Sequence, residues 1–135
     1  MIKSANVFLN FNGNCKQALD FYKNVFGAQI VECTTYKEAE MTENDNEKDF
    51  IMNSNIMIGG ILISCADNLE QNSHSGNQIA LWLETDSEES FHTIYSKFES
   101  QNLTILTEKE ETFWNSIYAK VQDDFGVIWE INYQK

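Results

Sequence analysis

The stretch NVFLNFNGNCKQALDFYKNVFG, residues 6–27, decides the fold. Its first six residues alternate between two sets of side chains, and Val7, Leu9 and Phe11 form the apolar set, as in a half-buried β-strand. Over residues 15–26 the apolar positions recur every three or four residues, which predicts an amphipathic helix. The stretch therefore predicts a strand whose apolar face packs against the helix that follows it.

Three residues mark the ends of this helix. Asn14 is the predicted N-cap, and Gln17 stands at the position of the second residue of a capping box. Gly27 follows the last apolar position and predicts the C-terminal stop.

The same order of elements occurs again farther along the chain. Residues 78–84 alternate like the first strand, and Ser87 precedes a second helix whose apolar stripe runs from Phe91 to Phe98. Gly59 and Gly60 predict a tight hairpin turn. Each strand–helix pair is followed by three strand-like segments, at residues 28–36, 50–58 and 61–66 in the first half and at 103–106, 113–122 and 127–133 in the second. The repeat predicts an α+β fold, a class that includes ferredoxin-like pairs.

Composition and charge exclude several classes of protein. The chain has 135 residues, enough for a single domain over residues 1–135, and its 9 Lys against 21 Asp plus Glu give a net charge of −12. No Arg occurs, so we expect neither nucleic acid nor an anionic membrane surface as a partner. The longest apolar run is far too short to cross a membrane, and no secretory signal is recognisable. We expect a cytoplasmic protein.

Three strings resemble the glyoxalase/bleomycin-resistance/dioxygenase superfamily, also called the vicinal oxygen chelate fold, and within it the PhnB-like branch. They are LNFNGNCKQALDFYKNVFG at residues 9–27, IMNSNIMIGGILISCAD at 51–67 and TFWNSIYAKVQDDFGVIWEINY at 112–133. The resemblance implies two βαβββ modules, about residues 1–72 and 73–135, whose strands form a cup-shaped mixed sheet with the helices on its convex side. It also implies a homodimer and a small-molecule ligand in the cup.

Metal-dependent members of this superfamily take ligands from the first and fourth strands of each module. Alternation places Asn6 at the first of these positions, Leu62 or Ser64 at the second, Gln78 at the third and Glu130 at the fourth. Only Glu130 is a strong ligand, so we expect no catalytic metal and no other cofactor. Alternation and the resemblance also place further side chains on the cup face: Phe8, Asn10, Asn53, Trp82 and Asn132.

Several residues have two interpretations. Glu130 is either a ligand or general base, or a hydrogen-bonded carboxylate at the base of a pocket. Phe113 and Trp114 lie either at the rim of the cup or in core packing. The acidic run of Glu108, Glu110 and Glu111 either blunts a solvated strand edge or flanks the mouth of the cup.

The remaining reactive side chains favour structural roles. Cys15 and Cys65 lie on expected core faces, whereas His74 and His92 lie on expected solvent-exposed positions, so no Cys–His nucleophile pair is expected. Trp129 and Tyr22 are expected to pack helix against sheet.

Two classes of function stay open. One is a metal-free protein that binds a small uncharged or cationic organic molecule with a planar part, including an antibiotic-sequestering resistance protein. The other is a metal-dependent lyase, isomerase or dioxygenase-like enzyme that uses Glu130 as a general base or as a metal ligand.

Overall fold

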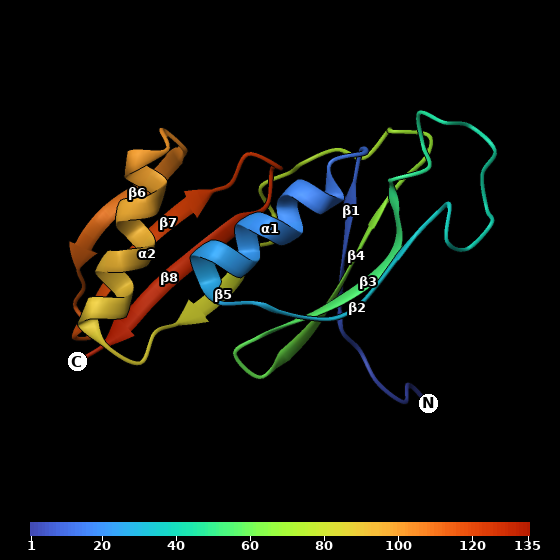
Figure 1. Ribbon diagram of the computed structural model, residues 1–135. Helices are drawn as coiled ribbons and strands as arrows, with labels where there is room; N and C mark the ends of the chain where they lie inside the picture. The colour runs from blue at the N-terminus through green and yellow to red at the C-terminus, as the bar shows by residue number, and fades with distance from the viewer. The chain divides into compact units, whose positions relative to one another are not determined.

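A computed structural model describes residues 1–135 and divides them into two compact units, Met1–Ser73 and His74–Lys135 (Figure 1). Each unit contains a strand, a helix and three further strands, in that order. The expected α+β fold of two βαβββ modules is therefore confirmed. No helix in the structure is both long enough and apolar enough to cross a membrane.

The first unit builds a four-stranded sheet in the order β1-β4-β3-β2. Strand β1 runs parallel to β4, and the β4–β3 and β3–β2 pairs are antiparallel. Gly59, at φ 60°, and Gly60 form the predicted hairpin turn between β3 and β4. The elements are β1 (Val7–Phe11), α1 (Cys15–Phe26), β2 (Gln29–Thr35), β3 (Ile51–Ile58) and β4 (Ile61–Asp67).

The second unit repeats this topology with the sheet order β5-β8-β7-β6. Strand β5 is parallel to β8, and the β8–β7 and β7–β6 pairs are antiparallel. Helix α2 covers one face of this sheet (Figure 1). The elements are β5 (Leu81–Glu84), α2 (Glu88–Ser100), β6 (Thr104–Glu111), β7 (Ser116–Gln122) and β8 (Ile128–Gln134).

Each unit has its core between its helix and one face of its sheet. Tyr22 of α1 is fully buried, as are Ile56 of β3 and Cys65 of β4. In the second unit Phe91 and Trp129 are fully buried. The expected core roles of Tyr22 and Trp129 are confirmed. Because neighbouring residues of a strand point to opposite faces, the residues that alternate with this core line an open face on each sheet.

Asn14 is the N-cap residue of α1, as predicted, but another side chain accepts from the N–H groups at the start of the helix. The side chain of Asn14 makes no capping hydrogen bond with the helix. Instead Oδ1 of Asp67, at the end of β4, accepts hydrogen bonds from the backbone N–H groups of Gly13 at 2.8 Å and Cys15 at 3.0 Å. A carboxylate is the stronger acceptor for these N–H groups, and the parallel β1–β4 pairing brings Asp67 to them. The predicted start of α2 at Ser87 is confirmed, because Oγ of Ser87 accepts a hydrogen bond from the backbone N–H of Ser90.

Three predicted strand boundaries are wrong. The strand predicted at residues 103–106 extends to Glu111 as β6. Gln78 lies in a bend before β5 and its side chain is exposed, so this residue is not part of the strand. Phe113 precedes β7 in a tight turn over residues 112–116, where Thr112 and Ser116 hydrogen-bond each other and Asn115 has a φ of 61°. The acidic run lies in β6, the edge strand of its sheet, which supports its interpretation as a solvated strand edge.

Candidate ligand-binding site

The open face of the second sheet brings polar and aromatic side chains together. Trp82 of β5 pairs with Glu130 of β8, and Glu84 pairs with Asn132. On the other side of β8, Asn132 pairs with Tyr118 of β7. Glu130, Asn132 and Tyr118 alternate with buried residues, and the ladder pairs place Trp82 and Glu84 beside Glu130 and Asn132, so the five side chains share one face.

Tyr118 and Glu130 form a short hydrogen bond on this face. The hydroxyl of Tyr118 donates to Oε1 of Glu130 at 2.5 Å. Burial raises the pKa of Tyr118, and the hydrogen bond to the Glu130 carboxylate raises this pKa further. Tyr118 therefore stays protonated as a donor, and Oε2 of Glu130 is left to accept a hydrogen bond from a ligand.

Two tryptophan rings contact Tyr118. Trp82 stacks on it with ring centroids 5.9 Å apart and an interplanar angle of 28°, while Trp114 meets it at 6.0 Å and 67°. The side chain of Trp82 is 48% exposed and that of Trp114 is 39% exposed. Flat π-surfaces and the Glu130 carboxylate are thus accessible side by side.

A hydrogen-bonded bridge connects the two indole groups. Nε1 of Trp82 donates to Oε1 of Glu84 at 3.2 Å, and Nδ2 of Asn132 donates to the same oxygen at 2.9 Å. Nε1 of Trp114 donates to Oδ1 of Asn132 at 3.4 Å. Asn132 is 2% exposed and Glu84 is exposed, so the bridge joins a buried amide to a solvent-exposed carboxylate.

Three residues of this cluster were not among the predicted site residues: Glu84, Trp114 and Tyr118. Tyr118 alternates with Ile117 and Ala119, which are buried, and this period of two could have placed it on the open face. Its contact with Glu130 depends on the pairing of β7 with β8, which no local pattern predicts. For Trp114, core packing is excluded by its exposure and by its contact with Tyr118.

The predicted residues of the first unit lie on the open face of the first sheet. Phe8 is 53% exposed, and Asn10 is exposed as well. Nδ2 of Asn6 donates to Oγ of Ser64 at 3.4 Å, and Asn53 is half-buried on β3. Phe8 and Asn10 of β1 and Asn53 of β3 therefore lie on one sheet face, and Asn6, which immediately precedes β1, contacts Ser64 of β4 on the same face.

The metal positions implied by the resemblance do not suit a divalent ion. Asn6 presents its Nδ2 donor to Ser64, and Gln78 lies outside β5. Glu130, the one strong ligand, already accepts a hydrogen bond at Oε1. The structure contains no group of three or more His, Cys, Asp or Glu side chains that could hold a metal ion.

The thiols do not form a nucleophilic site. Cys15 and Cys65 are buried, as expected, and burial raises the pKa of both, that of Cys65 to about 12. Burial also raises the pKa of Cys33, which lies on β2. A raised pKa keeps a thiol protonated and therefore poorly nucleophilic.

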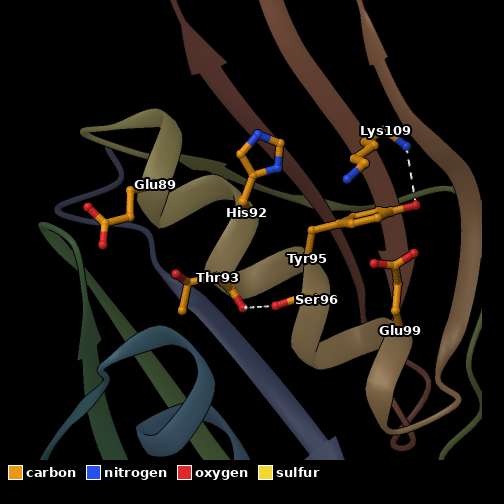
Figure 2. Close-up of a pocket in the computed structure, with 7 residues that line it drawn as sticks. All are labelled: Glu89, His92, Thr93, Tyr95, Ser96, Glu99 and Lys109. Atoms are coloured by element: carbon orange, nitrogen blue, oxygen red, sulfur yellow. Dashed lines mark hydrogen bonds between the residues drawn. The ribbon is translucent and has the colours of Figure 1, made fainter.

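A shallow depression lies on the outer side of α2, against β6 (Figure 2). The backbone N–H of Lys109 donates to the hydroxyl of Tyr95 at 3.3 Å, and Nζ of Lys109 lies 5.4 Å from the centroid of the Tyr95 ring. The other lining residues belong to α2 and are Glu89, His92, Thr93, Ser96 and Glu99. Figure 2 shows the side chains of Glu89 and His92 pointing away from each other.

Comparison with known proteins agrees with this architecture. The chain is 27% identical to protein YjdN of Escherichia coli over 138 residues, which span 95% of this chain and 93% of the relative. A structure described as a putative 3-demethylubiquinone-9 3-methyltransferase, PhnB protein, from Bacillus cereus superposes with a TM-score of 0.79 at 21% identity, covering 97% of this chain and 99% of that one. Protein PA1353 from Pseudomonas aeruginosa gives a TM-score of 0.80 at 22% identity, covering 97% and 98%.

The expected resemblance to PhnB-like proteins is confirmed by these relatives. A family model matches residues 5–131, nearly the whole chain and both repeats. The chain therefore belongs to the Glyoxalase/Bleomycin resistance protein/Dioxygenase superfamily.

Proposed function

We propose that this protein binds a small organic molecule on the open face of its second sheet, without a catalytic metal. The ligand is uncharged or cationic and has an aromatic or otherwise planar part. The observation that carries this proposal is the contact of Trp82 and Trp114 with Tyr118, whose hydroxyl in turn donates to Glu130.

The chemistry of the face supports this class of ligand. The rings of Trp82 and Tyr118 offer π-surfaces for stacking and for cation–π contact. Glu130 adds a negative charge beside them. The chain has no Arg and a net charge of −12, which disfavours phosphorylated and polyanionic ligands.

Amide side chains complete the proposed set of ligand-binding residues. They accept and donate hydrogen bonds without adding charge, which suits a ligand with polar substituents. The amides of the two units are proposed as separate sets: Gln78 belongs with Trp82 in the second unit, whereas Asn6, Asn10 and Asn53 belong with Phe8 in the first.

Thermal-shift screening followed by calorimetry tests the proposal. We expect planar cations and neutral aromatic compounds to stabilise the protein, and Trp82→Ala to weaken their binding by roughly 1 kcal/mol or more. Val31→Ala is the control, because Val31 is an exposed apolar residue on β2 of the other unit, 63% exposed. Stabilisation by phosphate esters or polycarboxylates alone would contradict the proposal.

One observation favours an enzyme as the second candidate. The Tyr118–Glu130 hydrogen bond pairs a proton donor with a proton acceptor on an accessible face, as acid–base catalysis requires. If the protein converts a ligand found by the screen, Glu130→Gln should abolish turnover while binding persists. A ligand that is recovered unchanged after prolonged incubation supports the binding protein.

A further inference from the structure

The amide of Asn132 lies between the two exposed indole groups of the candidate site. Its Nδ2 donates to Oε1 of Glu84 at 2.9 Å and to Oε2 at 3.1 Å, while its Oδ1 accepts from Nε1 of Trp114 at 3.4 Å. Glu84 in turn accepts from Nε1 of Trp82 at 3.2 Å and from the backbone N–H of Gln134 at 2.9 Å. A continuous chain of hydrogen bonds therefore runs from one indole to the other.

The chemistry of this bridge requires an amide at residue 132. The residue must donate to a carboxylate on one side and accept from an indole N–H on the other, and an amide does both at once. An aspartate there would place two carboxylates together in a buried position. A leucine of similar size would do neither, and would leave the indole N–H of Trp114 without its acceptor.

The bridge constrains how the rings are oriented. Each indole ring is held at its N–H end by the bridge. Trp82 also stacks on Tyr118, whereas Trp114 meets Tyr118 in a T-shaped contact. Both rings are partly exposed, so without the bridge each would sample several rotamers in solvent. A ring that is already fixed loses less entropy when a ligand stacks on it.

We propose that Asn132 is a positioning residue, which through Glu84 and Trp114 holds the two indole rings of the site in place for a flat organic cation. This inference rests on the proposed function, and it assigns separate roles within the site. Asn132 restricts the rotamers of the two indole rings and thereby raises the affinity for any flat ligand. Glu130, which keeps Oε2 for the ligand, governs the preference for positive charge.

The first test measures ring order without any ligand. In a nitrogen-15 correlation spectrum the three tryptophans give three indole N–H resonances, which can be assigned with Trp→Phe variants. We expect Asn132→Leu to shift and broaden the resonances of Trp82 and Trp114. The resonance of Trp129 is the internal control, because its Nε1 donates to Asp123 at 2.9 Å, away from the bridge. Unchanged Trp82 and Trp114 resonances would overturn the proposal.

A second variant covers the case in which Asn132→Leu does not fold. Trp114→Phe removes the N–H donor to Asn132 and keeps an aromatic ring against Tyr118. We expect it to shift the Trp82 resonance through Asn132 and Glu84. An unchanged Trp82 resonance would show that the two rings are independent and would overturn the proposal.

The binding test compares two probes of nearly the same shape. N-methylacridinium is a permanent flat cation, and acridine is the uncharged ring in mildly alkaline buffer. We expect Asn132→Leu to weaken both by a similar factor of about tenfold, because the loss of ring order affects every flat ligand. Glu130→Gln should weaken N-methylacridinium more than acridine.

Different results would contradict the proposed function and the positioning role of Asn132. If the wild-type protein binds neither probe but the indole resonances respond as expected, the proposed function fails and the positioning role stands. If both probes bind and Asn132→Leu leaves their affinities unchanged, the positioning role is wrong and the proposed function stands.

Discussion

The hydroxyl of Tyr118 donates to Oε1 of Glu130 across the β7–β8 pair, although the direct partner of Tyr118 in that ladder is Asn132. The contact is therefore diagonal, between residues two positions apart on the same sheet face, which a long aromatic side chain can span. Through this contact the Glu130 carboxylate, at the centre of the candidate site, is hydrogen-bonded to Tyr118.

Removal of this hydroxyl should lower stability modestly. Tyr118→Phe deletes a hydrogen bond to a carboxylate on a half-exposed face, and we expect a loss of about 1 kcal/mol in the free energy of unfolding. Urea unfolding followed by circular dichroism measures it. Tyr133→Phe is the matched control, because its side chain is half-buried on the opposite face and its hydroxyl makes no hydrogen bond. Equal losses in both variants would contradict the prediction.

Tyr118 should also make stability depend on pH in the alkaline range. Its folded-state pKa is raised above the ordinary value of 10.0, so the folded protein holds this proton more tightly than the unfolded chain. The stabilising contribution is complete below the unfolded pKa and is lost as the pH rises above it. We expect the free energy of unfolding to fall above about pH 10, and to fall less steeply in Tyr118→Phe. Urea titrations at increasing pH test this, and identical slopes in the two proteins would exclude it.

Asp67 should be far more important for α1 than the predicted cap, Asn14. Asp67 is 4% exposed, and its carboxylate accepts from the backbone N–H groups of Gly13, Cys15 and Ile51. Asp67→Ala leaves these three donors without their acceptor, and we expect a loss of about 3 kcal/mol or more. Asn14→Ala, the matched control, should lose about 0.5 kcal/mol or less, because its side chain accepts only from the backbone of Asn12. Chemical denaturation compares them, and a larger effect at Asn14 would refute this account.

Gly13 should not tolerate a side chain. Its φ is 95°, and a Cβ built on it would lie 2.7 Å from Cζ of Phe50. We expect Gly13→Ala to lower the free energy of unfolding by at least about 1 kcal/mol. Gly60→Ala is the control, since nothing lies within 4 Å of its added Cβ and its φ is not positive, and it should change stability by less than about 0.5 kcal/mol.

A double-mutant cycle separates the two causes at Gly13. If the Phe50 ring contributes, Gly13→Ala should be less destabilising in a Phe50→Ala background. An unchanged difference would assign the whole effect to the backbone conformation.

The sequence alone determined the elements and the core faces. The alternation of residues 7–11 and the helical stripe of residues 15–26 are local periodicities. An element that buries one face needs apolar residues at its own period, so the pattern can be recognised in the sequence. The duplicated order of elements and the three family strings then predicted the α+β repeat. Local signals were weaker at ends of elements, so Gln78 was wrongly placed in β5, and the N-cap position of Asn14 was correct although its side chain does not cap α1.

Only the tertiary structure decided which side chains meet. Trp82 and Tyr118 are 36 residues apart in the chain (118 minus 82), yet their rings stack because β5 and β7 both flank β8. Strand order and register set such contacts, and both follow from packing of the whole unit rather than from any short segment. For the same reason Asp67 caps a helix that begins 52 residues earlier, where the parallel pairing of β1 with β4 brings its carboxylate to the first N–H groups.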